Sequence, residues 1–479
     1  MCGPFSKGQI SMSDTTAEIS VGNLGSTPAG AGAAWWRKED WWAVILGLGL
    51  IAAAYGLFVG HASLAWLAVT PAKWTTFPQI AADFAAKWPR YLAQFVLWLA
   101  LVSGALSSLG YKLRNTLPAF IFLYIVSILI FALGQWAQAV KFNLEPPLVA
   151  LVVGLILANL NVLPRALDDG FRVEFYIKLG VVLLGATLPF TLILWAGPVA
   201  LLQAGVISLV TFGVIFAVAR ALGVEPRFAA TLGAGGAVCG VSAAIAIAAA
   251  VGARKQDAAA VVSIVVLWAI VMIFVLPFAA AGLHLASGVG GAWIGSSEFA
   301  DAAGLAAAQA YGAIAAKAQG ALPAVADQSV AAFTLMKVVG RDIWVGVWAI
   351  VLSIIAASRW ESTGIENEAS VGEVWRRFPK FVIGFLIASI AITLIAQSLG
   401  HAAFAKTADP GLVAPIKALR TWAFAFGFLS IGLTTRLADF AKVGPKPVIA
   451  FTAGVVVNVI LGLVLSTLVF GAYWSKLGQ

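Results

Sequence analysis

Long apolar runs alternate with short polar stretches along most of this chain. Such runs cover residues 42–58, 199–218, 258–278, 381–397 and 448–470. About 20 apolar residues in a helix span the ~30 Å hydrocarbon core of a bilayer. These runs lack the apolar/polar alternation that marks the strands of an outer-membrane barrel, so we predict that they cross the membrane as helices.

The same pattern, followed along the whole chain, predicts an all-α polytopic membrane protein with about 11–13 transmembrane helices. The predicted segments are residues 41–60, 90–109, 117–138, 147–163, 176–194, 198–220, 228–251, 257–281, 290–313, 330–357, 380–399, 414–435 and 447–471. If all of them cross, the two ends of the chain lie on opposite sides of the membrane.

The N-terminal residues have no apolar period and are rich in Gly, Ser, Thr and Ala, which is typical of a disordered tail. With the N-terminus inside, more Lys and Arg residues fall in cytoplasmic loops than in outer loops, as the positive-inside rule requires. We therefore predict an inner-membrane protein with a disordered cytoplasmic tail (1–34), N-terminal transmembrane helices (35–140) and a transporter core with two helical repeats (141–479).

The composition agrees with the membrane class and limits the chemistry. Of the 479 residues, 61% are apolar and 11% are charged, against roughly half and a quarter in soluble domains. The formal charge is +9, but the basic residues are scattered through short loops, so we expect the lipid bilayer and not nucleic acid as a partner. The chain has no cluster of His and Cys and no ATP-binding P-loop pattern. We therefore expect no metal, no cofactor and no enzyme.

Two segments interrupt the apolar pattern. The first, GAGGAVCGVS at 233–242, holds four glycines, and each costs a helix interior about 1 kcal/mol relative to Ala. The second, GGAWIGSSEFAD at 290–301, combines glycines and hydroxyls with two carboxylates. Non-helical backbone inside a membrane occurs only where it is buried in protein or faces a water-filled cavity. We predict discontinuous helices near the midplane, where secondary transporters place their sites.

The first segment supplies the components of an oxyanion site, which are free N–H groups, a helix N-terminus and a hydroxyl. We predict that Gly236, Cys239, Gly240 and Ser242 bind the substrate, with Ser297 of the second segment opposite them. The alternative is that the glycines only allow helices to pack closely.

Three charged residues, Lys337, Arg341 and Asp342, lie within a further predicted helix. Lys337 and Arg341 are four residues apart and share a helix face. A cation at the bilayer centre costs at least about 2.5–3.5 kcal/mol and needs a partner. We predict that Lys337 supplies charge to the substrate and that Asp342 neutralises Arg341 structurally. Alternatively, both cations snorkel to the interface.

The second segment carries the candidates for ion coupling. Glu298 and Asp301 are three residues apart, and we predict that they bind the coupling ion, a proton or sodium. Asn159 and Thr434 are polar groups in predicted spans, and we expect them to hydrogen-bond between helices.

From about residue 148 to the C-terminus, the sequence resembles the sulfate exporter family of bacterial membrane proteins. The resemblance rests on GAGGAVCGVSAAI at 233–245, GGAWIGSSEFAD at 290–301, KVVGRD at 337–342 and FGFLSIGLTT at 426–435. It implies a bacterial inner-membrane protein with an inverted-repeat, crossed-helix architecture similar to that of bile-acid symporters and sodium/proton antiporters. It also implies a sulfur oxyanion, such as sulfate or sulfite, as the substrate.

Together these observations predict a secondary active transporter of a small anion that is coupled to an ion gradient. A sodium- or proton-coupled transporter of another small solute, an integral-membrane enzyme and a channel are the alternatives. The sequence leaves open the direction of transport and whether the chain forms a homodimer.

Overall fold

The computed structural model describes residues 38–477, apart from 142–145, 161–162, 320–321, 361–379, 401–402, 437 and 439–443. The predicted tail at 1–34 lies outside the described residues. Within them all regular elements are helices, and the only β pairing is an isolated bridge between Trp74 and Trp136. The predicted all-α polytopic class is therefore confirmed.

Nine helices of the described residues are long and apolar enough to cross a membrane. Seven are α1 (Glu39–Val59), α2 (Phe77–Ser108), α3 (Leu113–Gly134), α7 (Phe190–Ala221), α10 (Lys255–Gly282), α16 (Phe381–Leu399) and α20 (Pro445–Val464), which η7 (Leu465–Val469) extends. The other two are composite. One joins α13 (Pro323–Thr334), η4 (Leu335–Arg341), α14 (Trp344–Ile355) and η5 (Ala356–Trp360), and the other joins η6 (Phe404–Val413) to α18 (Ala414–Thr434).

The remaining predicted segments correspond to shorter or interrupted helices. The short ones are α5 (Pro146–Asn159) and α6 (Val173–Gly185). The interrupted ones are the pair α8 (Pro226–Ala237) and α9 (Val241–Val251), and the pair α11 (Ser287–Ser297) and α12 (Asp301–Ala318). Both predicted discontinuities are therefore present. Short connecting elements are η2 (Leu64–Trp66), α4 (Ala137–Lys141), η3 (Arg165–Asp169) and α21 (Gly471–Trp474).

One predicted boundary is wrong. The sequence predicted a connection at 195–197, between segments 176–194 and 198–220, but α6 ends at Gly185 and α7 runs unbroken from Phe190 through Pro198. A proline inside a membrane helix is tolerated where the neighbouring structure accommodates the lost hydrogen bond. The chain turns instead at 186–189, where Pro189 forms the N-cap of α7.

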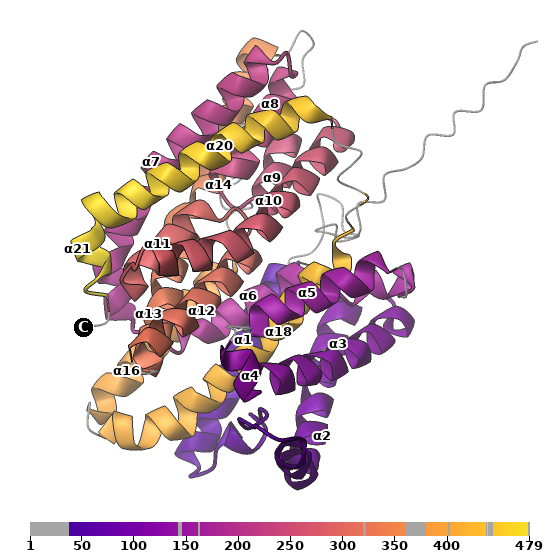
Figure 1. Ribbon diagram of the computed structural model, residues 1–479, viewed down its shortest axis with the longest axis vertical. Coiled ribbons are helices and arrows are strands. Elements are labelled where there is room, and N and C mark those ends of the chain that lie inside the picture. Colours follow the sequence, from indigo (N-terminus) through magenta and orange to yellow (C-terminus); the bar gives the residue numbers. More distant parts are fainter. Residues whose placement is uncertain are drawn as a thin grey trace, which may run out of the picture.

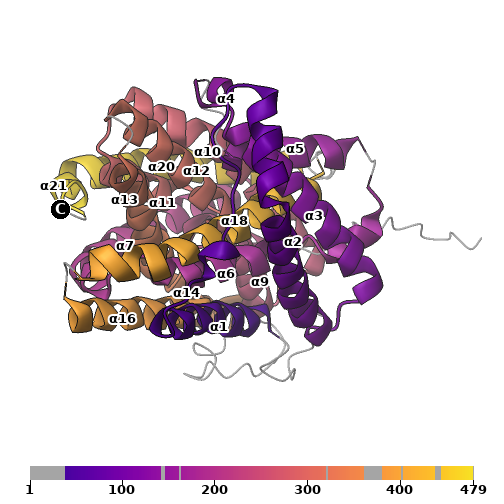
Figure 2. The ribbon, with the colours of Figure 1, turned by 90° about the horizontal axis from the view of Figure 1, so that it is seen from below.

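The helices form two bundles (Figure 1). In the flanking bundle, α18 packs on α3, α5 and α6. Helices α1 and α16 also pack on α6, and α2 packs on α3. The interrupted-helix bundle contains α7 to α14 and α20, in which α7 contacts α8, η4 and α20, and α10 contacts α9 and α12. Figure 2 shows α1 beside α16 at one face of the molecule. The N-terminal helices α1 to α3 therefore pack on helices from the later part of the chain.

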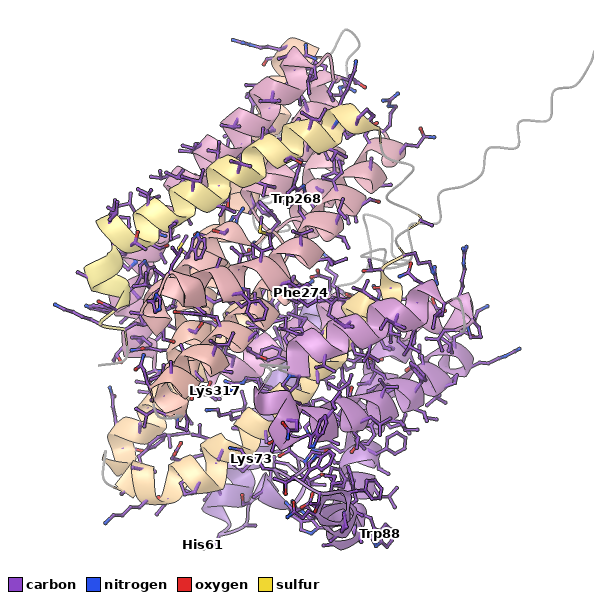
Figure 3. The ribbon with its side chains drawn as sticks, viewed as in Figure 1. His61, Lys73, Trp88, Trp268, Phe274 and Lys317 are labelled. Atoms are coloured by element: carbon purple, nitrogen blue, oxygen red, sulfur yellow. The ribbon has the colours of Figure 1, made fainter. Side chains whose placement is uncertain are left out.

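The outer surface carries many large apolar side chains. Leu394 on α16, Ile460 on α20 and Leu202 on α7 are each about three-fifths exposed. Figure 3 shows the side chains over the whole molecule, with Trp268 and Phe274 along α10. Contiguous apolar surface of this kind is unfavourable in water and is what a lipid environment requires.

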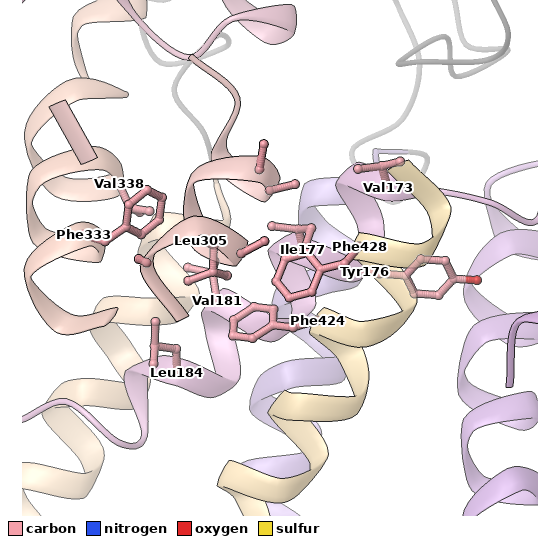
Figure 4. Packing of buried hydrophobic residues seen from close by; sticks show 14 of the residues in the cluster. Val173, Tyr176, Ile177, Val181, Leu184, Leu305, Phe333, Val338, Phe424 and Phe428 are labelled. Carbon is pink, nitrogen blue, oxygen red and sulfur yellow. The ribbon is translucent and has the colours of Figure 1, made fainter. Parts of the chain in front are cut away.

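Helix α6 lies where the two bundles meet. Figure 4 shows Val181 of α6 and Leu305 of α12 in the same buried cluster as Phe424 of α18 and Phe333 of α13. These apolar groups pack α6 against both bundles. The charged residues of α6 therefore also lie close to the interrupted helices, and this places the site described next.

Candidate functional site

The two interrupted helices meet at their breaks. Residues 238–240 separate α8 from α9, and residues 298–300 separate α11 from α12. Gly240 has φ +67°, and a Cβ atom there would lie 2.7 Å from the carbonyl oxygen of Phe299. Only glycine combines this backbone conformation with so close an approach. Gly240 is therefore the residue that lets one break lie against the other.

Lys337 joins the two breaks from η4. Its Nζ donates hydrogen bonds to the carbonyl oxygens of Val238 (2.9 Å), Glu298 (3.0 Å) and Phe299 (3.1 Å), and it lies 3.6 Å from Oδ1 of Asp301. The side chain is 0% exposed. The C-terminal ends of α8 and α11 carry partial negative charge, which compensates this buried cation.

Arg341 binds the same two helix ends. Its Nε donates to the carbonyl of Ala237 (3.1 Å), Nη2 donates to Gly236 (2.6 Å), and Nη1 donates to Ser296 (2.7 Å) and Glu298 (3.0 Å). Arg341 is also 0% exposed. The alternative that the two cations snorkel to the interface is therefore wrong, and both neutralise carbonyl groups that the breaks leave without helical partners.

These contacts change the expected role of Lys337. An ammonium group has three donors, and three backbone carbonyls take them. In this structure Lys337 thus acts on the protein backbone and has no donor left for a solute. Its predicted part in substrate binding remains a prediction, and the geometry assigns it a structural role.

The glycine cluster also differs in detail from its prediction. Helix α8 continues through Gly233, Gly235 and Gly236 to Ala237, so the break is confined to 238–240. Gly236 contributes a carbonyl to Arg341, not a free N–H, and a Cβ there would collide with Ile215 of α7. A Cβ on Gly233 would contact α7, and one on Gly235 would contact α10. Close packing, the alternative left open above, therefore accounts for these three glycines.

A polar cavity of about 170 Å³ lies beside the breaks, where the two bundles meet. Its walls come from α1, α6, α9, α12, α14 and α16 and from the residues around the breaks. The lining residues are Asp40, Lys178, Cys239, Ser242, Ala246, Asp301, Asp342, Val345 and Phe381. A water molecule occupies about 30 Å³ of liquid, so the cavity is large enough for a small solute with some of its hydration.

The charges around this cavity are unevenly paired. Lys178 Nζ lies 2.9 Å from Oδ1 of Asp40 and 3.3 Å from Oε2 of Glu174. Asp301 is close to Lys337 but leaves Oδ1 without a hydrogen bond. Asp342 is 2% exposed, and neither of its carboxylate oxygens has a hydrogen-bond partner. The predicted neutralisation of Arg341 by Asp342 is thus not a direct ion pair, because Arg341 points at carbonyl oxygens.

Of the predicted site residues, Cys239, Ser242 and Asp301 line this cavity, and their roles in binding and coupling stay predictions. Ser297 is elsewhere, since it is fully buried and a Cβ on Gly462 of α20 would lie 2.9 Å from its Oγ. It therefore does not face Ser242 across the cavity.

The side chain of Glu298 forms hydrogen bonds within the break between α11 and α12. Its Oε1 accepts hydrogen bonds from the N–H groups of Phe299 (3.0 Å) and Ala300 (3.2 Å), and Oε2 has no partner. Glu298 is fully buried and is not part of the cavity wall. A carboxylate at the start of α12 is favoured by the helix dipole. Its coupling role stays a prediction.

The two hydrogen-bonding residues lie in the flanking bundle. Nδ2 of Asn159 donates to the carbonyls of Leu155 (2.8 Å) and Thr435 (3.2 Å), which ties α5 to the end of α18. Thr434 donates to the carbonyl of Ser430 within α18 (2.8 Å). The predicted contact between helices is confirmed for Asn159, whereas Thr434 bonds within its own helix.

Sequence reasoning missed two charged residues of the cavity wall, Asp40 and Lys178. Asp40 pairs with Lys178 and accepts a hydrogen bond from the backbone N–H of Lys380. Lys178 follows Glu174 by four residues inside an apolar segment. A lysine within an apolar run and an acidic residue one turn earlier were signals of a functional charge that could have been used.

The fold and the site define a polytopic α-helical membrane protein with a charged cavity beside two interrupted helices. The sequence profile of the family described as Conserved hypothetical protein 698 matches residues 53–451, and the chain belongs to this family.

Several relatives are known as UPF0324 membrane proteins. One from Rhodopirellula baltica is 30% identical over 84% of this chain and 71% of its own length. One from Nitratidesulfovibrio vulgaris is 28% identical, and the alignment covers 76% of this chain and 61% of the relative, which is less than two thirds of it. One from Nitrosomonas europaea is 28% identical over 85% and 89% of the two chains. These names describe membrane proteins and state no substrate. No solved structure matches the chain.

Proposed function

We propose that this protein is a secondary active transporter of a small anion and that it binds the anion in the cavity beside the two breaks. The observation that carries the proposal is the position of this cavity. The cavity is lined by the N-terminal turn of an interrupted helix and by buried charged side chains, and it lies where the two bundles meet. Irregular backbone at membrane depth is tolerated beside a water-filled cavity, and transporters use it to bind solutes between parts that move relative to each other.

Anion binding is supported by the arrangement of helix ends. Helix α9 begins at Val241, and Ser242 in its first turn lines the cavity. The first N–H groups of a helix have no acceptor within it and carry partial positive charge. The opposing carbonyl ends of α8 and α11 are already neutralised by Lys337 and Arg341. The N-terminal end of α9 therefore keeps its attraction for an anion, and Lys178 of α6 also lines the cavity.

The carboxylates in the same cavity supply a reason for ion coupling. Two like charges about 5 Å apart, at an effective dielectric constant of about 20, repel each other by about 3 kcal/mol. Ionised Asp301 and Asp342 would thus oppose an anion near Ser242. Neutralisation of these carboxylates by a cation or a proton removes the repulsion, so that the anion and the coupling ion bind together.

A sulfur oxyanion is the proposed substrate class. The support for sulfate or sulfite is the resemblance of residues 233–245, 290–301, 337–342 and 426–435 to the sulfate exporter family, together with the size of the cavity. The second candidate is a cation-coupled transporter of another solute. It is favoured by one observation, the excess of carboxylates (Asp40, Asp301, Asp342) over cations (Lys178) in the cavity wall.

Uptake into proteoliposomes tests the proposal. Radiolabelled sulfate and sulfite are offered to the purified wild-type chain with and without sodium and pH gradients, and to Ser242→Ala. The matched control is Ser398→Ala, whose hydroxyl bonds only the carbonyl of Ile395 in its own helix. We expect saturable uptake of one anion and an affinity about 10- to 150-fold weaker in Ser242→Ala, because a hydrogen bond to a charged group contributes about 1.5–3 kcal/mol.

Other results decide between the alternatives. Absence of saturable uptake of either anion under every gradient would overturn the sulfur-oxyanion assignment. Flux that rises linearly with concentration would indicate a channel. Equal affinities in Ser242→Ala and Ser398→Ala would show that the anion does not bind at the start of α9.

A further inference from the structure

Asp342 is a buried carboxylate with no hydrogen-bond partner. It lies at the end of η4, is 2% exposed, and faces the cavity with both oxygens unsatisfied. Its neighbour in sequence, Arg341, directs its hydrogen bonds at four backbone carbonyls on α8 and α11. The adjacent guanidinium therefore gives Asp342 no hydrogen bond.

The surroundings of Asp342 supply no other free cation among the described residues. The charged and titratable groups that face it come from α1, α6, α12, η4 and the break between α8 and α9, and they are Asp40, Glu174, Lys178, Asp301, Lys337, Arg341 and Cys239. Lys178 is paired with Asp40 and Glu174, and Lys337 is held by three carbonyls. Together with Asp342 itself, the four carboxylates exceed the three cations by one. Asp342 bonds none of these cations, so we expect its charge to be neutralised from outside the protein.

An ionised carboxylate in this position is costly. Removing a charge from water without a partner costs several kcal/mol, and the usual response is to take up a proton or a metal ion. A sodium or divalent site needs several oxygen ligands around one point. In the part of the chain that the structure describes, no group of three or more His, Cys, Asp or Glu side chains is placed to hold a metal ion, which argues against a divalent ion. A proton needs no ligand besides the carboxylate itself, and the comparison of sodium with potassium described below tests the other monovalent cation.

We propose that Asp342 is the proton-binding residue of this cavity, with Asp301 beside it, and that the coupling ion of the transporter is a proton. The inference rests on the proposed function and names its driving ion. The carboxylate of Asp342 takes a proton from hydronium in the cavity and becomes a neutral acid, and it returns the proton to water when the cavity faces the other side. No bond other than the O–H bond forms or breaks.

Protonation and anion binding are then linked. A neutral Asp342 removes one negative charge from the cavity wall that contains Ser242. The anion binds more tightly to the protonated form, and by reciprocity the bound anion favours the proton. The expected consequence is that a proton and the anion move in the same direction.

Infrared difference spectroscopy of the protein in lipid tests proton binding without a substrate. Spectra are recorded over about pH 4 to 9, a range that brackets shifted carboxyl groups, for wild type, Asp342→Asn, Asp342→Glu and the control Asp83→Asn. Asp83 is paired with Lys87 on α2 and does not line the cavity. We expect a titrating protonated-carboxyl band that is lost in Asp342→Asn, shifted but present in Asp342→Glu, and unchanged in Asp83→Asn. A band that persists in Asp342→Asn would overturn the proposal, as would a band that disappears with sodium but not with potassium at constant pH.

Transport separates this inference from the proposed function. With sulfate as the probe, wild type should accumulate the anion under a pH gradient, while Asp342→Asn should lose accumulation and retain exchange of labelled for unlabelled sulfate. If wild type transports sulfate but Asp342→Asn still accumulates it under a pH gradient, the proposed transport function is supported and the proposal that Asp342 binds the coupling proton is wrong. If wild type transports no anion, the proposed function fails, and the infrared result alone decides whether Asp342 binds a proton.

Discussion

Replacing Lys337 by Met tests whether this buried cation holds the interrupted helices together. The substitution keeps the length of the side chain but removes Nζ, which donates to three carbonyls at 2.9–3.1 Å. Hydrogen bonds to a charged donor are worth about 1.5–3 kcal/mol each, so their gross loss is about 5–9 kcal/mol. Relief of the cost of burying the ammonium offsets part of this loss, and breaking one side of a buried charge interaction costs about 3–5 kcal/mol net.

The assay is equilibrium unfolding in mixed micelles, with helicity as the signal. The matched control is Lys73→Met, an exposed lysine between η2 and α2, which we expect to change the unfolding free energy by less than about 0.5 kcal/mol. We expect Lys337→Met to lose about 3–5 kcal/mol relative to that control. If Lys337→Met is as stable as Lys73→Met yet no longer binds the anion, Lys337 is a substrate ligand and its structural role is wrong.

Further substitutions address other parts of the same structure. Gly240→Ala should lower the free energy of unfolding by about 2–6 kcal/mol, because it adds backbone strain at φ +67° to a collision with the carbonyl of Phe299. If the variant unfolds at the wild-type midpoint, the two breaks are not in contact. In the wild type, Nε of Arg172 donates a hydrogen bond to Oε1 of buried Glu39 at 2.8 Å. Arg172→Met removes this partner and should lower the free energy of unfolding by about 3–5 kcal/mol. Restoration of stability in the double variant with Glu39→Gln would confirm the cause, and a loss that persists there would point to packing instead.

Much of the helical pattern was predictable because a membrane makes secondary structure a local problem. A backbone in hydrocarbon must satisfy its own hydrogen bonds, so each apolar run of sufficient length becomes a helix without reference to the rest of the chain. The two interruptions were predictable for a related reason, since glycines and polar groups at 233–242 and 290–301 weaken a helix where water cannot replace the lost bonds. The wrong boundary at 195–197 shows the limit, because the neighbouring helices decide whether a helix continues through a proline such as Pro198.

The site was only partly predictable. Sequence spacing placed Lys337 and Arg341 on one helix face, but their partners are carbonyls of residues 236–238 and 296–299, which lie about 40 to 105 positions earlier. Asp40 reaches Lys178 from a separate helix, a pairing with no local signal.

The sequence by itself determined the class of protein, the rough position of most helices, and the two places where helices break. These properties depend on short stretches of chain and their transfer from water to lipid. The tertiary structure decided which charged side chains have direct partners in the protein and which have none. It assigned Lys337 and Arg341 to the carbonyl ends of α8 and α11 and left Asp342 without a partner in the cavity. That outcome depends on distances of a few ångströms between helices that are distant in sequence, because a buried charge is compensated only by groups in direct contact with it.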